Sequence, residues 1–282
     1  MHSIPEITLE AVISRYAVLL LDAFGVLVDG QGALPGAGEL VQRLHQSGKA
    51  YYILTNDASQ LPATRARGLH SCGLTVDPER IITSGMLLTG YFALHGLAGT
   101  SCAVLGTADS VRYVELAGGR IVPPAEAFEV LVIGDQSGFP FLETVDAALS
   151  TLFRVLDRQQ HVHLVLPNPD LFYPEAGGGF GIASGGVAAM FEAALQARYP
   201  HRPELRFTRL GKPSAEIFAE ALRRSGTREM VMLGDQLETD ISGARAFGLD
   251  AVWVTTGVTA AAVSTWPAHL RPTYHLRSLR PL

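Results

Sequence analysis

Short apolar runs rich in valine, isoleucine and leucine alternate along this chain with segments of helical periodicity. A short, continuous apolar run is typical of a strand buried on both faces, and such strands belong to parallel sheets that helices cover on both sides. The alternation therefore predicts an α/β fold with a doubly wound, mainly parallel sheet. Strands are expected at 17–21, 51–54, 230–233 and 251–254, and helices at 37–46 and 216–224.

A second set of strands and helices lies between the two halves of this sheet. It contains the apolar runs 102–105, 130–133 and 162–166 and the helical pattern 141–156. We therefore expect a smaller α/β cap domain, residues 84–205, inserted into a core formed by residues 1–83 and 206–282. Within the insert, the glycine-dense stretch 177–186 predicts a loop that leads into a helix at Val187.

Composition narrows the class of protein. The 282 residues are 48% hydrophobic and 17% charged, as in an ordinary globular protein. A net charge of -5 provides no basic field for nucleic acid or for an anionic membrane, so neither is expected as a partner. The two cysteines, Cys72 and Cys102, predict no disulfide framework, and the N-terminus lacks the pattern of a signal peptide. We expect a cytoplasmic protein, with homo-oligomerisation left open.

Polar residues gather at the ends of the predicted core strands or in the loops beside them. Asp22 ends the first apolar run, at the edge where open α/β sheets bind ligands. Each group alone fits a turn or a helix cap, but their convergence on one edge predicts a functional site. The three further groups are Thr55-Asn56-Asp57, Gly211-Lys212-Pro213, and Gly234-Asp235 with Asp240.

This order of residues resembles the haloacid dehalogenase (HAD) superfamily, in which an Asp nucleophile, a Thr or Ser, a Lys and an acidic loop follow one another. The resemblance covers nearly the whole chain. In more detail the chain is similar to phosphatases related to the bacterial NagD protein, with a type IIA α/β cap between the Thr and Lys motifs. It implies a phosphoric monoester hydrolase that uses Mg²⁺ on a small phosphorylated metabolite. The most specific matches are Leu54-Thr55-Asn56-Asp57, Asn168-Pro169-Asp170, Gly211-Lys212-Pro213 and the segment from Gly234 to Asp240.

The resemblance implies a role for each residue that agrees with its chemistry. A carboxylate such as Asp22 is ionised at neutral pH, so it can attack phosphorus without a base and form an aspartyl-phosphate. Thr55 can donate its hydroxyl to the phosphate, and Asn56 its amide or its backbone N–H. Lys212 can neutralise both the phosphate and the nearby carboxylates.

The resemblance also implies a magnesium site at Asp22, the backbone carbonyl of Phe24, and Asp235. Magnesium binds through one or two carboxylates together with substrate phosphate and water. Asp240 is expected to orient Lys212 or metal-bound water, although an acidic residue in the first turn of a helix explains it nearly as well.

The Asn168 to Asp170 segment follows a strand of the insert. By the resemblance, Asn168 and Asp170 could point toward the leaving group of the substrate. The flanking prolines make a rigid turn an equally good explanation.

Phe24 departs from the family pattern. Most phosphatases of the family carry Asp at this position, where it protonates the leaving oxygen and then activates water; losing such a group costs about 10²–10⁴ in rate. Three interpretations stay open. They are a phosphatase impaired or restricted to good leaving groups, a weak or inactive phospholigand-binding protein, and a metal-free 2-haloacid dehalogenase, against which the Gly234-Asp235 pair argues.

Overall fold

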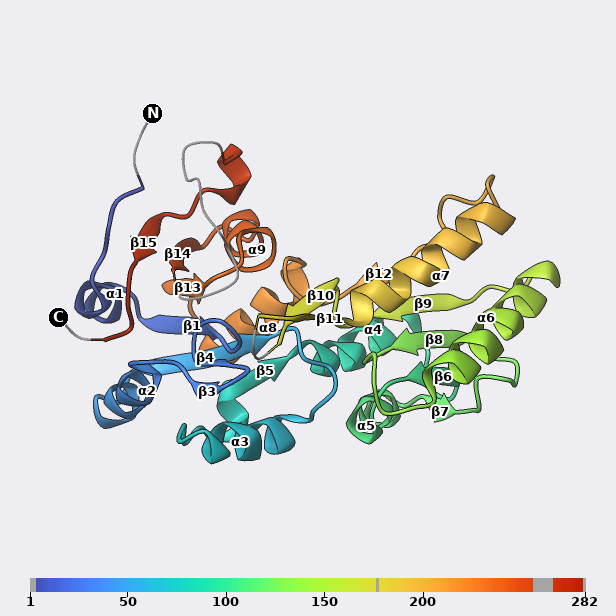
Figure 1. Cartoon of the computed structure of the whole chain (residues 1–282), viewed down its shortest axis with the longest axis horizontal. Coiled ribbons are helices and arrows are strands. Elements are labelled where there is room, and N and C mark those ends of the chain that lie inside the picture. Colours follow the sequence, from blue (N-terminus) through green and yellow to red (C-terminus); the bar gives the residue numbers. More distant parts are fainter. Residues whose placement is uncertain (1–3, 176–177, 256–265, 281–282) are drawn as a thin grey trace. The chain divides into compact units, whose positions relative to one another are not determined.

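The computed structural model describes residues 4–175, 178–255 and 266–280. The chain divides into two compact units (Figure 1). The first contains Met1–Thr55, Pro62–Ile82 and Lys212–Leu282, and the second contains Asn56–Leu61 and Thr83–Gly211. The sequence prediction placed the second border between residues 205 and 206. The border lies later because β12 (Thr208–Arg209) pairs with a strand of the second unit.

A six-stranded sheet forms the centre of the first unit, in the order β15-β14-β13-β1-β4-β5. The central strand β1 runs parallel to both of its neighbours, β13 and β4. All five of its residues are buried, as expected for an apolar strand covered on both faces. The predicted α/β class with a mainly parallel sheet is confirmed. The strands are β1 (Val18–Asp22), β4 (Ala50–Thr55), β5 (Ile81–Thr83), β13 (Met230–Gly234), β14 (Asp250–Val254) and β15 (Tyr274–Leu276).

Amphipathic helices pack on this sheet. In α2 the buried residues are Ala37, Leu40, Val41 and Leu44, the spacing of a single helical stripe, and this stripe joins the core cluster that contains Leu19 and Leu21 of β1. The remaining elements of this unit are shorter or lie at its edges. Its helices are α1 (Leu9–Arg15), α2 (Ala37–Gln46), α3 (Pro62–Ser71), α8 (Ala215–Ser225) and α9 (Ser242–Ala246), with short 3-10 helices η1 (Pro78–Arg80) and η5 (Ala268–Leu270), a π-helical segment η3 (Leu237–Ile241), and the hairpin β2 (Val28–Asp29) and β3 (Gly32–Ala33).

The second unit has its own five-stranded sheet, in the order β12-β9-β8-β6-β7, and every adjacent pair is parallel. Side chains of β8 alternate between two cores. Val130 and Val132 pack with Phe92 and Tyr113 on one face, whereas Leu131 and Ile133 join a cluster with the helices on the other. These strands are β6 (Ser101–Leu105), β7 (Arg120–Ile121), β8 (Val130–Ile133), β9 (His163–Leu166) and β12.

In the described part of the second unit, helices cover both faces of this sheet. The longest, α6, has 17 residues and buries a stripe from Val145 to Leu156. None of the helices in the described ranges is both long and apolar enough to span a lipid bilayer. The helices are α4 (Leu87–His95), α5 (Ala108–Leu116), α6 (Phe141–Asp157) and α7 (Ser184–Arg198), and the turn η2 (Ser84–Met86) precedes α4.

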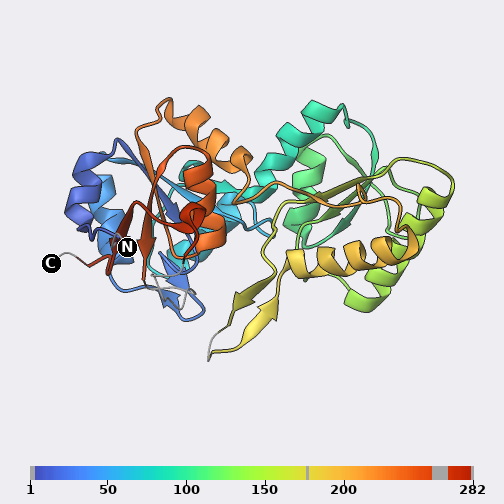
Figure 2. The same ribbon diagram turned by 90° about the horizontal axis from the view of Figure 1, so that it is seen from above.

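A hairpin of β10 (Phe172–Pro174) and β11 (Phe180–Ile182) extends from the second unit (Figure 2). Much of the stretch predicted as a loop, 177–186, is therefore a strand followed by a helix, and α7 begins at Ser184 rather than at Val187; Gly177 lies outside the described residues. The hairpin was missed because its apolar side chains, Phe180 and Ile182 among them, are exposed and give no buried run.

Candidate active site

The strand register brings the predicted site residues of the first unit to one edge of the sheet. Asp22, the last residue of β1, is paired with Leu54 in β4, so Thr55 follows directly beside it. On the other side Leu21 is paired with Leu233 in β13, so that strand also ends next to Asp22 and leads into Asp235. Because all three strands are parallel, their carboxyl ends meet at this edge.

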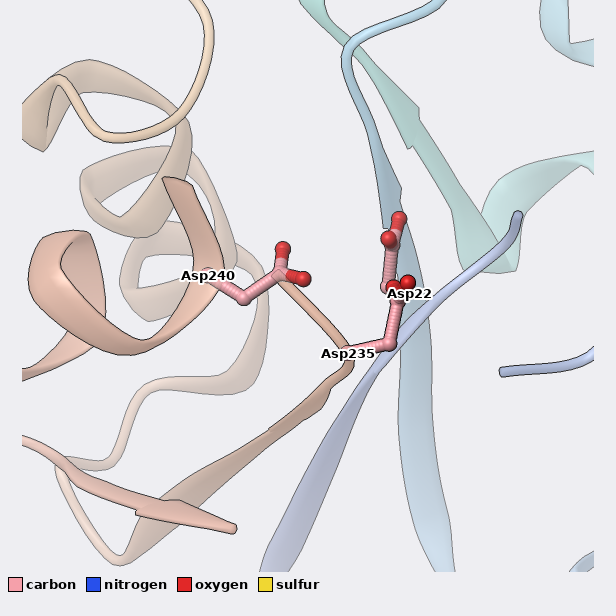
Figure 3. A group of neighbouring side chains, drawn as sticks. All are labelled: Asp22, Asp235 and Asp240. Carbon is pink, nitrogen blue, oxygen red and sulfur yellow. The ribbon is translucent and has the colours of Figure 1, made fainter. Parts of the chain in front are cut away.

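Three carboxylates converge there. One oxygen each of Asp22, Asp235 and Asp240 lies within 4.8 Å of the other two, and all three residues are buried. Figure 3 shows the carboxylates of Asp22 and Asp235 side by side, with the Asp240 side chain extending toward them. Like charges at this separation repel strongly where water is excluded, so the cluster requires positive charge.

Lys212 supplies one positive charge. Its ammonium nitrogen lies 2.7 Å from Oδ1 of Asp22, 2.6 Å from Oδ1 of Asp240 and 3.1 Å from the carbonyl oxygen of Leu54. Burial alone would lower the pKa of Lys212, but the charges of Asp22 and Asp240 outweigh burial and hold the pKa above its ordinary value. Lys212 is therefore a buried, ionised group that bridges two carboxylates.

Asp240 lies in η3, a segment of π-helix that follows β13. Its Oδ1 accepts a hydrogen bond from Lys212, and its Oδ2 accepts one from the backbone N–H of Gln236 at 3.2 Å. Burial raises the pKa of Asp240 and the charge of Asp22 acts in the same direction, whereas Lys212 opposes them. The geometry thus links Asp240 directly to Lys212, one of the two arrangements that the sequence left open.

The Asp22 carboxylate is held by one of its two oxygens. Oδ1 accepts hydrogen bonds from the backbone N–H of Ala23, at 2.7 Å, and from Lys212. No hydrogen bond among the described residues ends on Oδ2. Because Oδ1 is fixed in this way, Oδ2 points in a defined direction, as a nucleophile in phosphoryl transfer must.

Two glycines make room for the acidic cluster: Gly25, which the sequence analysis did not single out, and Gly234, for which it gave no separate role. Gly25 has φ +87°, and a Cβ built on it would lie 2.4 Å from the carboxyl carbon of Asp235. A Cβ on Gly234 would lie 2.2 Å from the Cβ of Asp240. In the sequence, each of these glycines lies close to an acidic residue. The structure shows why glycine is needed: a side chain at either position would collide with an aspartate of the cluster.

Asn56, Asn168 and Asp170 belong to the second unit, and Asn56 is joined to Thr55 by a peptide bond. The Asn56 amide nitrogen donates a hydrogen bond to Oδ1 of Asp170 at 2.8 Å. Asn168 Oδ1 in turn accepts one from the backbone N–H of Asp170 at 3.0 Å. The side-chain nitrogen of Asn56 is thus bonded to protein, and Asn168 closes a turn.

The donor set suits a hard cation. Three carboxylates and one ammonium group leave two formal negative charges in a buried site. All the candidate ligand atoms are oxygens, which is the preference of magnesium and calcium rather than of zinc or copper. Phe24, half-buried two residues after Asp22, can add only its backbone carbonyl, which is also an oxygen.

Comparison with known proteins identifies the class. A model of haloacid dehalogenase-like hydrolases matches residues 19–120, and a HAD-hydrolase-like model matches residues 209–282. A solved structure from Cytophaga hutchinsonii, described as a possible sugar phosphatase of the HAD superfamily, is 31% identical, with a TM-score of 0.83 over 98% of this chain and 99% of its own. The chain therefore belongs to the haloacid dehalogenase-like hydrolases.

Its similar proteins within this class carry phosphatase names. Dihydroxyacetone phosphatase from Corynebacterium glutamicum is 27% identical over 93% of this chain and 89% of its own length. A structure of glycerol phosphate phosphatase from Mycobacterium tuberculosis, in complex with magnesium, is 26% identical, with a TM-score of 0.80 over 95% of this chain and 76% of its own. NagD from E. coli K-12 shares the fold, with a TM-score of 0.76 at 23% identity over 94% of this chain and 97% of its own. The predicted family is confirmed.

Proposed function

We propose that this protein is a magnesium-dependent phosphatase that hydrolyses a small phosphorylated metabolite through an aspartyl-phosphate on Asp22. The observation that carries the proposal is the buried Asp22 carboxylate, fixed through Oδ1 by Lys212 within a cluster of three carboxylates. Phosphoryl transfer needs a positioned nucleophile and positive charge around the transferred group, and this arrangement can supply both.

In the proposed reaction, Oδ2 of Asp22 attacks phosphorus while the bond to the leaving oxygen breaks with its electron pair. Lys212 and the hydroxyl of Thr55 stabilise the phosphoryl oxygens, and Asn56 is assigned to the same group. Water then attacks the phosphorus of the aspartyl-phosphate, releasing inorganic phosphate and restoring the carboxylate. Asp240 keeps Lys212 in place and ionised throughout.

Magnesium would be held by the Asp22 and Asp235 carboxylates and the Phe24 carbonyl, and when bound it would neutralise charge on the phosphoryl group. The oxygen donors and the excess negative charge of the site support this assignment. The magnesium complex of the mycobacterial relative is consistent with it.

Phe24 limits the range of substrates. It has no proton to give to a leaving alkoxide, so esters of poor leaving groups should react slowly. The same residue favours a second candidate function, a phospholigand-binding protein with little turnover.

The substrate class is proposed from the relatives. Because one relative is named dihydroxyacetone phosphatase and another glycerol phosphate phosphatase, three-carbon phosphate esters are the first candidates. Sugar phosphates and nucleoside monophosphates come next.

The test is a screen of the purified protein with these esters, acetyl phosphate and p-nitrophenyl phosphate, with Mg²⁺ or with excess chelator. We expect hydrolysis only with Mg²⁺ and none by Asp22→Asn. A matched control is Asp29→Asn, because Asp29 lies outside the cluster and Asn keeps the Oδ1 acceptor used by the backbone of Gln31. Undiminished hydrolysis by Asp22→Asn would rule out Asp22 as the nucleophile.

A further inference from the structure

The orientation of the Asn56 amide is decided by its partner. An ionised carboxylate only accepts hydrogen bonds, so the atom 2.8 Å from Oδ1 of Asp170 must be the amide nitrogen. The amide oxygen then lies on the opposite side, against Gly211, where a Cβ would come within 2.5 Å of it. The carbonyl oxygen of Asn56 accepts a hydrogen bond from Oγ of Ser84 at 2.6 Å. Asn56 is 5% exposed, and hydrogen bonds hold both its side-chain nitrogen and its carbonyl oxygen.

Asp170 is itself held by a rigid turn. Its backbone N–H donates to Oδ1 of Asn168, and its carbonyl oxygen accepts from the N–H of Gly185 at 2.9 Å, at the start of α7. Gly185 permits this approach because a Cβ there would lie 2.3 Å from the carbonyl oxygen of Pro169. A carboxylate whose backbone is fixed on both sides can impose its position on the group it binds.

We propose that Asp170 is a positioning residue for the phosphatase reaction, acting through the Asn56 side chain and not on the substrate; this inference rests on the proposed function. One N–H of the Asn56 side chain is bonded to Asp170, and in this assignment the backbone N–H of Asn56 contacts the phosphoryl group. That N–H belongs to the peptide plane shared with Thr55, so the amide anchor sets the orientation of the plane. A carboxylate aimed at a phosphate would repel it, which is a second reason to place Asp170 behind Asn56.

The two substitutions Asp170→Ala and Asp170→Asn separate this role from others. Alanine removes the acceptor, and we expect kcat/KM for p-nitrophenyl phosphate to fall about 10–100-fold, as for a misplaced binding group. Asparagine keeps an oxygen that can accept from Asn56, so it should retain activity within about threefold, with an unchanged pH profile. The control is Asp157→Asn, because Asp157 lies on the surface of the same unit, bound by Arg198 and Tyr199.

The decisive measurement is a double-mutant cycle. If Asp170 acts through Asn56, then Asp170→Ala should change kcat/KM less than about twofold in an Asn56→Ala background. Full additivity of the two substitutions would overturn the proposal. So would an Asp170→Asn variant that is as inactive as Asp170→Ala and loses one limb of the pH profile, because that result would show that Asp170 acts as an acid or a base. A loss of thermal stability with unchanged kcat/KM would show a merely structural role and would also overturn it.

Binding of orthophosphate in the presence of Mg²⁺, measured by calorimetry, separates this inference from the proposed function. If the wild type binds phosphate but hydrolyses no ester, the proposed function is overturned. The inference about Asp170 still holds in that case if Asp170→Ala weakens phosphate binding and Asp170→Asn restores it. If the wild type and Asp170→Ala hydrolyse the ester equally well, the inference is overturned and the proposed function stands. A wild type that neither binds nor hydrolyses overturns both.

Discussion

The ammonium nitrogen of Lys212 lies 2.6 Å from Oδ1 of Asp240, and both side chains are almost completely buried. Buried charges are costly unless each has a partner, and removing one partner leaves the other uncompensated. Lys212 compensates Asp22 in the same way, so a single ammonium group stabilises two carboxylates. The pair therefore links the stability of the first unit to its proposed chemistry.

Replacing Lys212 with methionine should abolish hydrolysis and lower the free energy of unfolding by about 3–5 kcal/mol, the cost of breaking a buried ion pair. Both tryptophans, Trp253 and Trp266, belong to the first unit, so urea unfolding followed by tryptophan fluorescence reports on the right part of the chain. The control is Lys49→Met, since Lys49 is the other lysine of the sequence and lies outside the site. Equal losses in the two variants would contradict the argument.

Magnesium should stabilise the first unit, because the buried cluster carries excess negative charge. A concentration of 100 times the dissociation constant should add about 2.7 kcal/mol, and excess chelator should remove it. Thermal melting followed by tryptophan fluorescence measures the effect. Asp235→Asn should respond to Mg²⁺ much less than Asp29→Asn does, and an equal response would exclude Asp235 as a ligand.

Gly25→Ala should weaken Mg²⁺ binding and hydrolysis at least about 10-fold, because the new methyl group must displace the Asp235 carboxylate. Its positive φ adds a strain of about 1–2 kcal/mol that any L-residue would suffer. Gly32→Ala is the matched control: Gly32 also has a positive φ, +133°, but nothing lies within 4 Å of its Cβ position. Mg²⁺ titration of both variants separates strain from displacement, and equal affinities would refute the steric argument.

Phe24→Asp should accelerate the hydrolysis of alkyl phosphates by up to about 10²–10⁴, since it restores a general acid and base. The wild type should prefer acyl and aryl phosphates, with a burst followed by slow turnover as the aspartyl-phosphate accumulates. Rapid-quench kinetics on a matched aryl and alkyl pair gives both rates. Burst-free, efficient alkyl phosphate hydrolysis by the wild type would show that another residue supplies the proton.

Much of the fold could be predicted where a buried periodic pattern is undisturbed. The helix expected at 37–46 and the strand at 130–133 have those bounds in the structure, because each has one clear pattern of burial. The hairpin β10–β11 and the pairing of β12 with β9 could not be predicted. Both depend on tertiary contacts, and their segments are short and exposed.

The candidate site divides in the same way. The placement of Asp22 and Asp235 at one edge followed from the rule that parallel strands present their carboxyl ends together. Lys212 follows no strand of that sheet, and its assignment to the site rested on the resemblance to the family. The geometric need for Gly25 could not be read from the sequence, because it arises from the carboxylate of Asp235, more than 200 residues further along the chain.

Two of the four borders between the units fall beside candidate site residues, one between Thr55 and Asn56 and one between Gly211 and Lys212. Exchanging the second unit for that of a relative would therefore split a functional motif at these two borders. Within the second unit Asn56 contacts both Asp170 and Gly211, so a chimaera should take all three from the same parent. Splice sites placed before Thr55 and after Lys212 would instead keep each motif whole.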